Sequence, residues 1–400
     1  MLILSLSEKI LSFICGFGIL QGMLMAGFIY FHPKSDRSVN IFLAVYIFCI
    51  TAVMTMPFTM NLIGWQNSYF IQPIPMLPGI LLFFYLRSFK EAITWQKIMP
   101  HLLPVLLIFF LAYFNLTAMG RIYPDAKEVP VEGLKRPLSL LVMLIRTIQQ
   151  LLYYFLARNA LKSYQRSIHH LFSETSRIDL QWAKFLVNGY VVLICTFLVV
   201  FPLMLSYPQY FNSLLLVNMA IATPYIYMAT YKGFMQHTIW QMRPDINKQA
   251  VQEEIHKAEE IERGSVDSSN QKTEKPGLSA ERIAELVKKI TNLMVTEKLY
   301  QETELTLQQL ADKLEAPAYQ VSQALNEGMK KNFYDVVNGY RVEEAKRLLL
   351  DAKNRNYTIL SVGFEAGFNS KTTFNTVFKK FTGLTPTEFR DRGSIPAVST

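Results

Sequence analysis

The chain has 400 residues, of which 51% are hydrophobic and only 18% are charged. This balance is unusual for a soluble protein and indicates membrane helices. The formal net charge of +9 fits either DNA or an anionic membrane surface as a partner and excludes neither. The three cysteines lie at unrelated spacings inside apolar runs, which argues against a disulfide framework or a zinc site.

Seven apolar segments in residues 1–232 predict a seven-helix transmembrane bundle. Each is about 20 residues long, the length of helix that crosses a bilayer. A buried helix of a soluble protein would explain any one segment, but seven in succession favour a membrane domain. The first segment has no basic region before it and no small-residue cleavage site, so we expect it to be retained as a helix. The predicted spans are Ile10–Phe31, Ile41–Gly64, Phe70–Leu86, Ile98–Thr117, Leu138–Ala157, Phe185–Leu205 and Phe211–Tyr231.

Basic residues concentrate in the first, third and fifth loops between these segments, whereas the second and sixth loops carry no charge. Because cytoplasmic loops are enriched in lysine and arginine, the N-terminus is expected outside and everything after Tyr231 in the cytoplasm. The basic residues are Lys34 and Arg37 in the first loop, Arg87, Lys90 and Lys97 in the third, and Arg158, Lys162, Arg166, Arg177 and Lys184 in the fifth.

Five polar residues within the predicted membrane segments form a candidate sensing site. An ionisable side chain inside a membrane is a functional-site hypothesis by default. The alternative for Arg146 is that its side chain extends to the outer headgroups, while Asn188 lies near the cytoplasmic end of its segment. The bundle holds no carboxylate pair and no His-Glu-x-x-His or Gly-x-Ser-x-Gly motif, so we predict no enzyme activity, metal or cofactor. The five residues are Arg146, Gln149, Gln150, Asn188 and Asn218.

Residues 233–278 are predicted to form a cytoplasmic linker. The stretch Gln249–Glu262 is charged and has a thin apolar stripe, a pattern typical of a short helix. Two heptads at most are few for a coiled coil, and a homodimer formed through this helix is a hypothesis. The stretch Arg263–Gly277 has almost no apolar residues, which predicts disorder.

Residues 279–392 are rich in helix signals, and residues 393–400 are predicted to be a tail. Residues 279–299 keep their apolar side chains on one helical face. Thr306 and Gln309 then have the spacing of a capping box, and Pro317 can begin the following helix, AYQVSQALNEGM. These two helices predict a helix-turn-helix, and Phe333–Leu350 follows as one long helix.

A second helix-turn-helix is predicted in Tyr357–Arg390. Thr358 is expected to cap its first helix, Gly367 to end that helix and Ser370 to cap the second. Thr385–Glu388 predicts a short third helix with its own capping box. The residues expected to face inward are Leu360, Val362, Phe364 and Ala366 on the first helix and Phe374, Val377, Phe378 and Phe381 on the second.

Two helix-turn-helix units joined by a helix with YRVEEAKRLL, followed by GF-x-S-x-x-x-F-x-x-x-F-K-K-x-x-G-x-T-P-x-x-F-R, resemble the DNA-binding domain of AraC/XylS-type bacterial transcription regulators. The resemblance covers Leu305–Arg390 and does not extend to the membrane half. It implies that two recognition helices enter successive major grooves of double-stranded DNA, and that the membrane is a bacterial cytoplasmic membrane. Carried over by position, the DNA-binding residues are Ala318, Tyr319, Ser322 and Gln323 on the first recognition helix and Lys371, Thr372 and Thr376 on the second. The polar and basic residues of the second helix add Asn375, Lys379 and Lys380 to the predicted DNA-binding residues.

These residues differ in what they are expected to read. Lys371, Thr372 and Thr376 can reach base edges, whereas Lys379 and Lys380 are better placed as phosphate contacts. The first recognition helix carries no lysine or arginine at its outward positions, so its reading is expected to depend on glutamine contacts and on DNA shape.

The sequence as a whole predicts an all-α protein with an N-terminal seven-helix transmembrane bundle and a C-terminal double helix-turn-helix domain. The corresponding function is a membrane-bound, sequence-specific transcription regulator whose bundle senses an unknown ligand or a membrane-protein signal. Two other interpretations stay open. The bundle could be a transporter or channel with a regulatory DNA-binding tail, or it could anchor the regulator to the lipid membrane without sensing anything.

Overall fold

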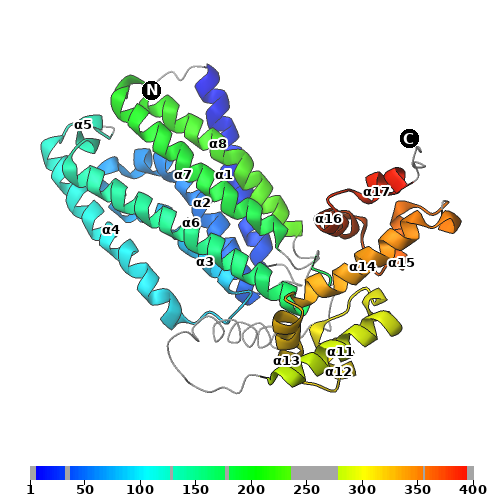
Figure 1. Ribbon diagram of the computed structural model, residues 1–400. Coiled ribbons are helices and arrows are strands. Elements are labelled where there is room, and N and C mark those ends of the chain that lie inside the picture. The colour runs from blue at the N-terminus through cyan, green and yellow to red at the C-terminus, as the bar shows by residue number, and fades with distance from the viewer. Residues whose placement is uncertain are drawn as a thin grey trace. The chain divides into compact units, whose positions relative to one another are not determined.

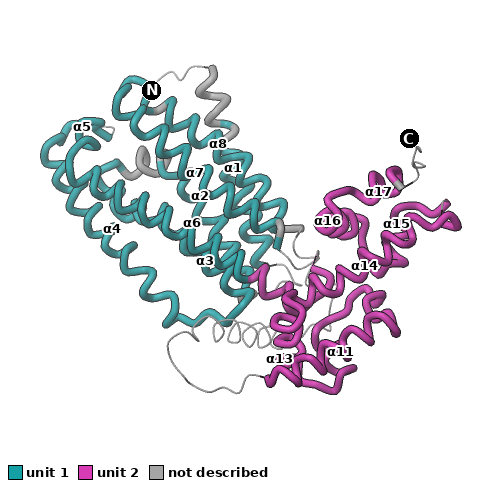
Figure 2. The backbone as a smooth tube through the Cα atoms, in the orientation of Figure 1, with its two compact units in different colours: residues 1–163, 180–245 teal, residues 164–179, 246–400 magenta. Residues whose placement is uncertain are grey.

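The part of the chain that the structure describes is helical and contains no β-strand, which confirms the predicted all-α class. The structure is a computed structural model. The helices gather into two compact units, residues 1–163 with 180–245 and residues 164–179 with 246–400 (Figure 2). The predicted helix Gln249–Glu262, the predicted disordered stretch Arg263–Gly277 and the tail after Gly393 lie outside the described residues. The described residues are 6–31, 37–126, 129–175, 180–235, 278–354 and 356–393.

Unit 1 is built from long apolar helices, coloured blue to green in Figure 1. Six of its described helical stretches are long and apolar enough to cross a membrane, judged by length and composition. The described part of the first helix adds a shorter apolar stretch, Gly16–Phe31. In chain order the elements are α1 (Leu6–Phe31), α2 (Arg37–Ile63), η1 (Trp65–Phe70), η2 (Ile74–Met76), α3 (Leu77–Arg87), α4 (Trp95–Ile122), α5 (Val131–Leu134), α6 (Pro137–Leu171), α7 (Gln181–Ser206), η3 (Pro208–Tyr210) and α8 (Phe211–Met235).

The third predicted span is not one continuous helix. The chain makes the two 3-10 turns η1 and η2 before α3 begins, and α3 itself has 11 residues, about half of a membrane crossing. Proline lacks the backbone N–H that a helix interior needs, and Pro73 and Pro75 lie in the broken stretch. Pro78 falls in the first turn of α3, where the missing N–H is tolerated.

Glycines allow the helices of unit 1 to approach closely. A side chain at Gly189 of α7 would collide with the ring of Tyr225 on α8, and one at Gly22 of α1 would collide with the hydroxyl of Thr51 on α2. Tyr225 is also held by polar contacts, because its hydroxyl donates to the carbonyl of Leu186 at 3.0 Å. Close backbone approach through small residues is the usual way in which apolar helices pack in a membrane.

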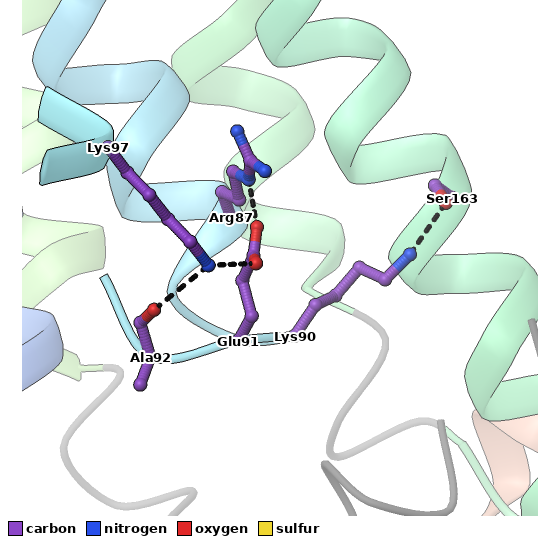
Figure 3. Close-up of polar contacts among 6 residues, drawn as sticks. All are labelled: Arg87, Lys90, Glu91, Ala92, Lys97 and Ser163. Atoms are coloured by element: carbon purple, nitrogen blue, oxygen red, sulfur yellow. Dashed lines mark hydrogen bonds and ion pairs between the residues drawn. The ribbon is translucent and has the colours of Figure 1, made fainter. Parts of the chain in front are cut away.

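The loop between α3 and α4 is held by a cluster of charged side chains (Figure 3). Arg87 and Lys97 both donate to the carboxylate of Glu91. Burial opposes ionisation of this carboxylate, but the two hydrogen bonds hold the pKa of Glu91 below its ordinary value. Lys90 of the same loop donates to the hydroxyl of Ser163 on α6 at 2.8 Å, so the loop is tied to α6 within unit 1.

Unit 2 contains the helices predicted for the C-terminal part, coloured yellow to red in Figure 1, together with the end of α6 and the residues that follow it. Helix α14 covers the residues predicted for the long helix, and Ser279, Thr306, Asn332, Thr358 and Ser370 all cap helices through their side chains. In chain order the elements are α11 (Ala280–Thr296), η4 (Leu299–Gln301), α12 (Leu307–Lys313), α13 (Ala318–Gln323), the π-helical turn η5 (Ala324–Gly328), α14 (Phe333–Leu350), η6 (Ala352–Asn354), α15 (Ile359–Glu365), α16 (Lys371–Thr382) and α17 (Pro386–Gly393).

The core of the second helix-turn-helix differs from the prediction at two phenylalanines. Phe364 was expected to face inward, but 50% of it is exposed. On a helix, positions two apart lie about 200° from each other, so Phe364 points away from Val362 and Ala366, which are buried. Phe381 is 37% exposed because it lies in the last turn of α16. The other predicted core residues of α16, Phe374, Val377 and Phe378, are buried.

Candidate nucleic-acid interface

Local signals place the recognition helix α16. The hydroxyl of Thr358 accepts from the backbone N–H of Ser361 at 3.0 Å and begins α15. Gly367 has a φ of +96°, a left-handed conformation that favours glycine and lets the chain turn into α16. The hydroxyl of Ser370 then accepts from the N–H of Thr373 at 3.1 Å and begins α16. The caps at Thr358 and Ser370 and the turn at Gly367, predicted for the second helix-turn-helix, are therefore confirmed.

Helix α16 separates an apolar inner face from a polar outer face. Its inward side chains pack in the core of unit 2, and the helix carries no acidic residue. The outward residues are small polar or basic groups of the kind that contact base edges and phosphates. Of the residues predicted on this helix, Lys371, Thr372, Thr376, Lys379 and Lys380 are exposed and Asn375 is half-buried.

Lys380 has partners within the protein. Its ammonium group lies 2.7 Å from the carboxylate of Asp335 on α14 and 5.5 Å from the ring centroid of Tyr334. The side chain is nevertheless 58% exposed, so this ion pair lies at the surface and is weak. A DNA phosphate near α16 would compete with Asp335 for the same ammonium group.

The first recognition helix is short and presents fewer polar groups. Helix α12 begins with the predicted capping box, in which Thr306 and Gln309 each accept a hydrogen bond from the other's backbone N–H. On α13, Tyr319 is 51% exposed and Ala318 is half-buried. Gln323 is half-buried and donates to Glu327 at 3.0 Å. Ser322 is only 7% exposed, so the structure turns this predicted contact residue toward the core.

Arg341 on α14 is a buried residue whose role the sequence reading did not identify. It has 0% exposure, and its guanidinium donates to the carbonyls of Tyr300 and Glu302 at 2.7 Å each and to the side chain of Asn338 at 3.2 Å. Burial lowers the pKa of Arg341 to about 10, so the group stays charged at neutral pH. The sequence did contain a signal for the burial of Arg341. It lies four residues from the apolar positions 337 and 345, which places it on the buried face of the helix.

Within unit 1, three of the five predicted polar residues lie together on α6. Arg146 donates to the side chain of Gln72 at 3.1 Å. Gln149 and Gln150 donate to the carbonyls of Met76 and Pro75, each at 3.1 Å. These carbonyls belong to the broken stretch that leads into α3, and the side chains of α6 give them hydrogen-bond donors. Asn188 is exposed on α7 and Asn218 is half-buried on α8, and no described contact links either of them to Arg146.

Comparison with known proteins places the C-terminal part in a family. Residues 310–392 match a family described as a helix-turn-helix domain. Over 102 residues the chain is 29% identical to an uncharacterized HTH-type transcriptional regulator of Staphylococcus aureus (strain COL). The matched stretch covers 26% of this chain and 13% of that protein. Over 55 residues it is 38% identical to the probable transcription factor PqrA of Proteus vulgaris, and this stretch covers 13% of this chain and 45% of that protein.

A solved structure of a protein of unknown function from Listeria innocua is also similar, at 25% identity over 26% of this chain and 95% of that chain, with a TM-score of 0.24. The chain spans less than half the length of either curated relative that it matches. Residues 310–392 are a helix-turn-helix domain of the AraC type, which confirms the resemblance that the sequence motifs indicated.

Proposed function

We propose that the chain is a membrane-bound transcription regulator, in which unit 1 spans a bacterial cytoplasmic membrane and unit 2 binds promoter DNA sequence-specifically. The observation that carries the proposal is the outer face of α16, where Lys371, Thr372 and Thr376 are exposed on a capped helix without acidic residues. This face belongs to a domain of the helix-turn-helix family, and both curated relatives are named as regulators or transcription factors. The long apolar stretches of unit 1 support the membrane location.

Substitution on the outer face of α16 tests the DNA-binding part. Lys371→Ala and Thr376→Ala are each expected to weaken binding to a specific duplex by about 1–3 kcal/mol, because each removes a base or phosphate contact. The measurement is the dissociation constant of the full-length protein in lipid nanodiscs for a duplex enriched from a random-sequence library on the wild-type protein. Thr387→Ala, at an exposed position of α17, is the matched control and should bind normally. Equal affinity of all three variants and the wild type would show that Lys371 and Thr376 of α16 do not contact the DNA.

Orientation in the membrane is a separate prediction. The basic residues of the third and fifth loops support a C-terminus in the cytoplasm, where promoter DNA is found. An epitope tag after Thr400 is expected to resist protease added to intact spheroplasts and to be digested in inside-out vesicles. A tag inserted after Asp125, in the fourth loop, should show the opposite pattern. Digestion of the C-terminal tag in intact spheroplasts would contradict the proposed topology.

Signal input to the regulator is proposed to come through unit 1. Arg146, Gln149 and Gln150 lie on one stretch of α6 and contact residues 72–76, which supports them as members of one polar site. A ligand there would act only through a difference in its affinity for two conformations of the protein. A homodimer through residues 249–262 belongs to the same proposal and rests on the sequence pattern alone.

A further inference from the structure

Residues 172–175, which follow α6 directly, are buried within unit 2, and we refer to them as the docking segment. Phe172, Ser173, Glu174 and Thr175 are all 6% exposed or less. Four consecutive buried residues are unusual for a loop, because a buried loop needs partners for each backbone and side-chain polar group. These partners come from three separate parts of the helix-turn-helix domain.

The first set of contacts fixes the docking segment to the start of the first helix-turn-helix. Phe172 pairs with Thr306, the capping residue of α12, in an antiparallel β-bridge. The backbone N–H of Ser173 donates to the carbonyl of Leu305 at 3.2 Å, and the hydroxyl of Ser173 donates to the same carbonyl at 2.7 Å. The segment is thus bonded to the backbone from which α12 begins.

The second set of contacts involves the long helix α14. Asn338 donates to the carbonyl of Ser173 at 2.9 Å, and Arg341 donates to the hydroxyl of Ser173 at 3.2 Å. Both side chains have 0% exposure. Arg341 also binds the carbonyls of Tyr300 and Glu302, so one guanidinium joins α14, the docking segment and the chain leading to α12.

The third set of contacts reaches the second recognition helix. Thr373, in the first turn of α16, donates its hydroxyl to the carboxylate of Glu174 at 3.2 Å and is itself buried. A carboxylate near the N-terminal turn of a helix is electrostatically favourable. Glu174 also favours the charged form of the buried Arg341. The same first turn carries Lys371 and Thr372 on its outer face.

We propose that the docking segment clamps the two helix-turn-helix units at one relative placement, and that DNA affinity falls when the segment leaves this position. The inference rests on the proposed function. It follows from the contacts, because Phe172, Ser173 and Glu174 together bond the start of α12, the middle of α14 and the first turn of α16. Two recognition helices that bind one duplex together gain affinity when their relative placement is fixed before binding.

The docking segment directly follows α6, a helix of 35 residues. The part of α6 up to Ser163 belongs to unit 1, and the part from Tyr164 belongs to unit 2. Ser163 is the residue that accepts the hydrogen bond from Lys90 (Figure 3). The segment lies outside residues 310–392, which match the helix-turn-helix family. This chain therefore adds to its DNA-binding domain a clamp that the helix-turn-helix family match does not include.

The test compares DNA affinity among variants of the full-length protein in lipid nanodiscs, with the duplex enriched on the wild type and a random duplex as probes. Ser173→Ala, Glu174→Ala and Thr373→Val are each expected to raise the dissociation constant for the enriched duplex by about tenfold. The double variant of Glu174→Ala and Thr373→Val should lose less affinity than the sum of the two single losses, because both substitutions remove the hydrogen bond between Thr373 and Glu174. Glu343→Ala removes a carboxylate from the exposed side of α14 and should stay within about twofold of the wild type.

A second measurement separates loss of the clamp from loss of the fold. Hydrogen exchange at the backbone amide of Ser173 should accelerate in Glu174→Ala and Thr373→Val, while exchange in the core of α16 stays at the wild-type rate. Affinities within twofold of the wild type in all three single variants, or tighter binding, would overturn the clamp. If the wild type itself does not prefer the enriched duplex over the random one, the proposed function fails, which is a different outcome.

Discussion

Arg341→Met is expected to lower the free energy of unfolding of unit 2 by about 3–5 kcal/mol and to abolish sequence-specific DNA binding. The guanidinium of Arg341 has 0% exposure and donates to two backbone carbonyls, to Asn338 and to Ser173. Methionine fills a similar volume but donates nothing, so the carbonyls of Tyr300 and Glu302 would lose a strong donor inside the protein.

Arg347→Met is the matched control for this change because it removes the same group from the same helix. Arg347 is 58% exposed in its side chain, and its partner Glu344, which is 10% exposed, keeps Lys298 as a second cation 3.7 Å away, so we expect a loss of about 1 kcal/mol. Urea unfolding followed by hydrogen exchange in α14 and α16 measures both variants in the full-length protein. Similar losses at the two positions would show that Arg341 does not hold the helix-turn-helix units together.

Gly367→Ala is expected to destabilise unit 2 by at least about 3 kcal/mol, because the new methyl group has no space and the backbone is strained. Gly367 has a φ of +96°. A Cβ atom there would lie 2.6 Å from the carbonyl oxygen of Tyr300 and 2.8 Å from the Cα of Gln301, and both are backbone atoms that cannot turn aside. The carbonyl of Tyr300 also accepts the hydrogen bond from Arg341. The substitution would therefore disturb this hydrogen bond as well as the close approach of Gly367 to Tyr300.

Gly383→Ala separates backbone strain from collision. Gly383 has a φ of +78°, but a Cβ atom there would meet nothing within 4 Å. We expect it to lower the free energy of unfolding by about 1 kcal/mol, the cost of left-handed geometry for alanine. Thermal unfolding of the two variants and the wild type measures the difference. If Gly367→Ala is no worse than Gly383→Ala, the close approach between Gly367 and Tyr300 does not limit the packing of this domain.

Much of unit 2 could be predicted from residues close together in the chain. The capping pairs Thr306 with Gln309 and Thr385 with Glu388 span three residues each, and both form. The helix Phe333–Leu350 and the turn at Gly367 are present as predicted. Such signals are reliable because the hydrogen bond and the residues that make it lie within one helical turn.

The errors arose where burial depends on a neighbouring element. Phe364 was predicted in the core together with every second residue from Leu360 to Ala366, but in the helix α15 its side chain lies at the surface. Ser322 was assigned to the reading face, and the packing of α13 buries it. In unit 1, hydropathy drew the third span as one segment, whereas the structure breaks it at Pro73 and Pro75, and side chains of α6 donate to the backbone carbonyls there.

The sequence by itself determined the helical class, the two helix-turn-helix units and the outer face of α16, because these depend on helical periodicity and on caps a few residues apart. Only the tertiary structure decided which contacts hold the two helix-turn-helix units together. Ser173 bonds Leu305 across 132 positions of the chain, and Glu174 accepts from Thr373 across 199. No local pattern marks such partners, since a serine and a glutamate at the end of a helix look like ordinary solvated residues until the fold buries them.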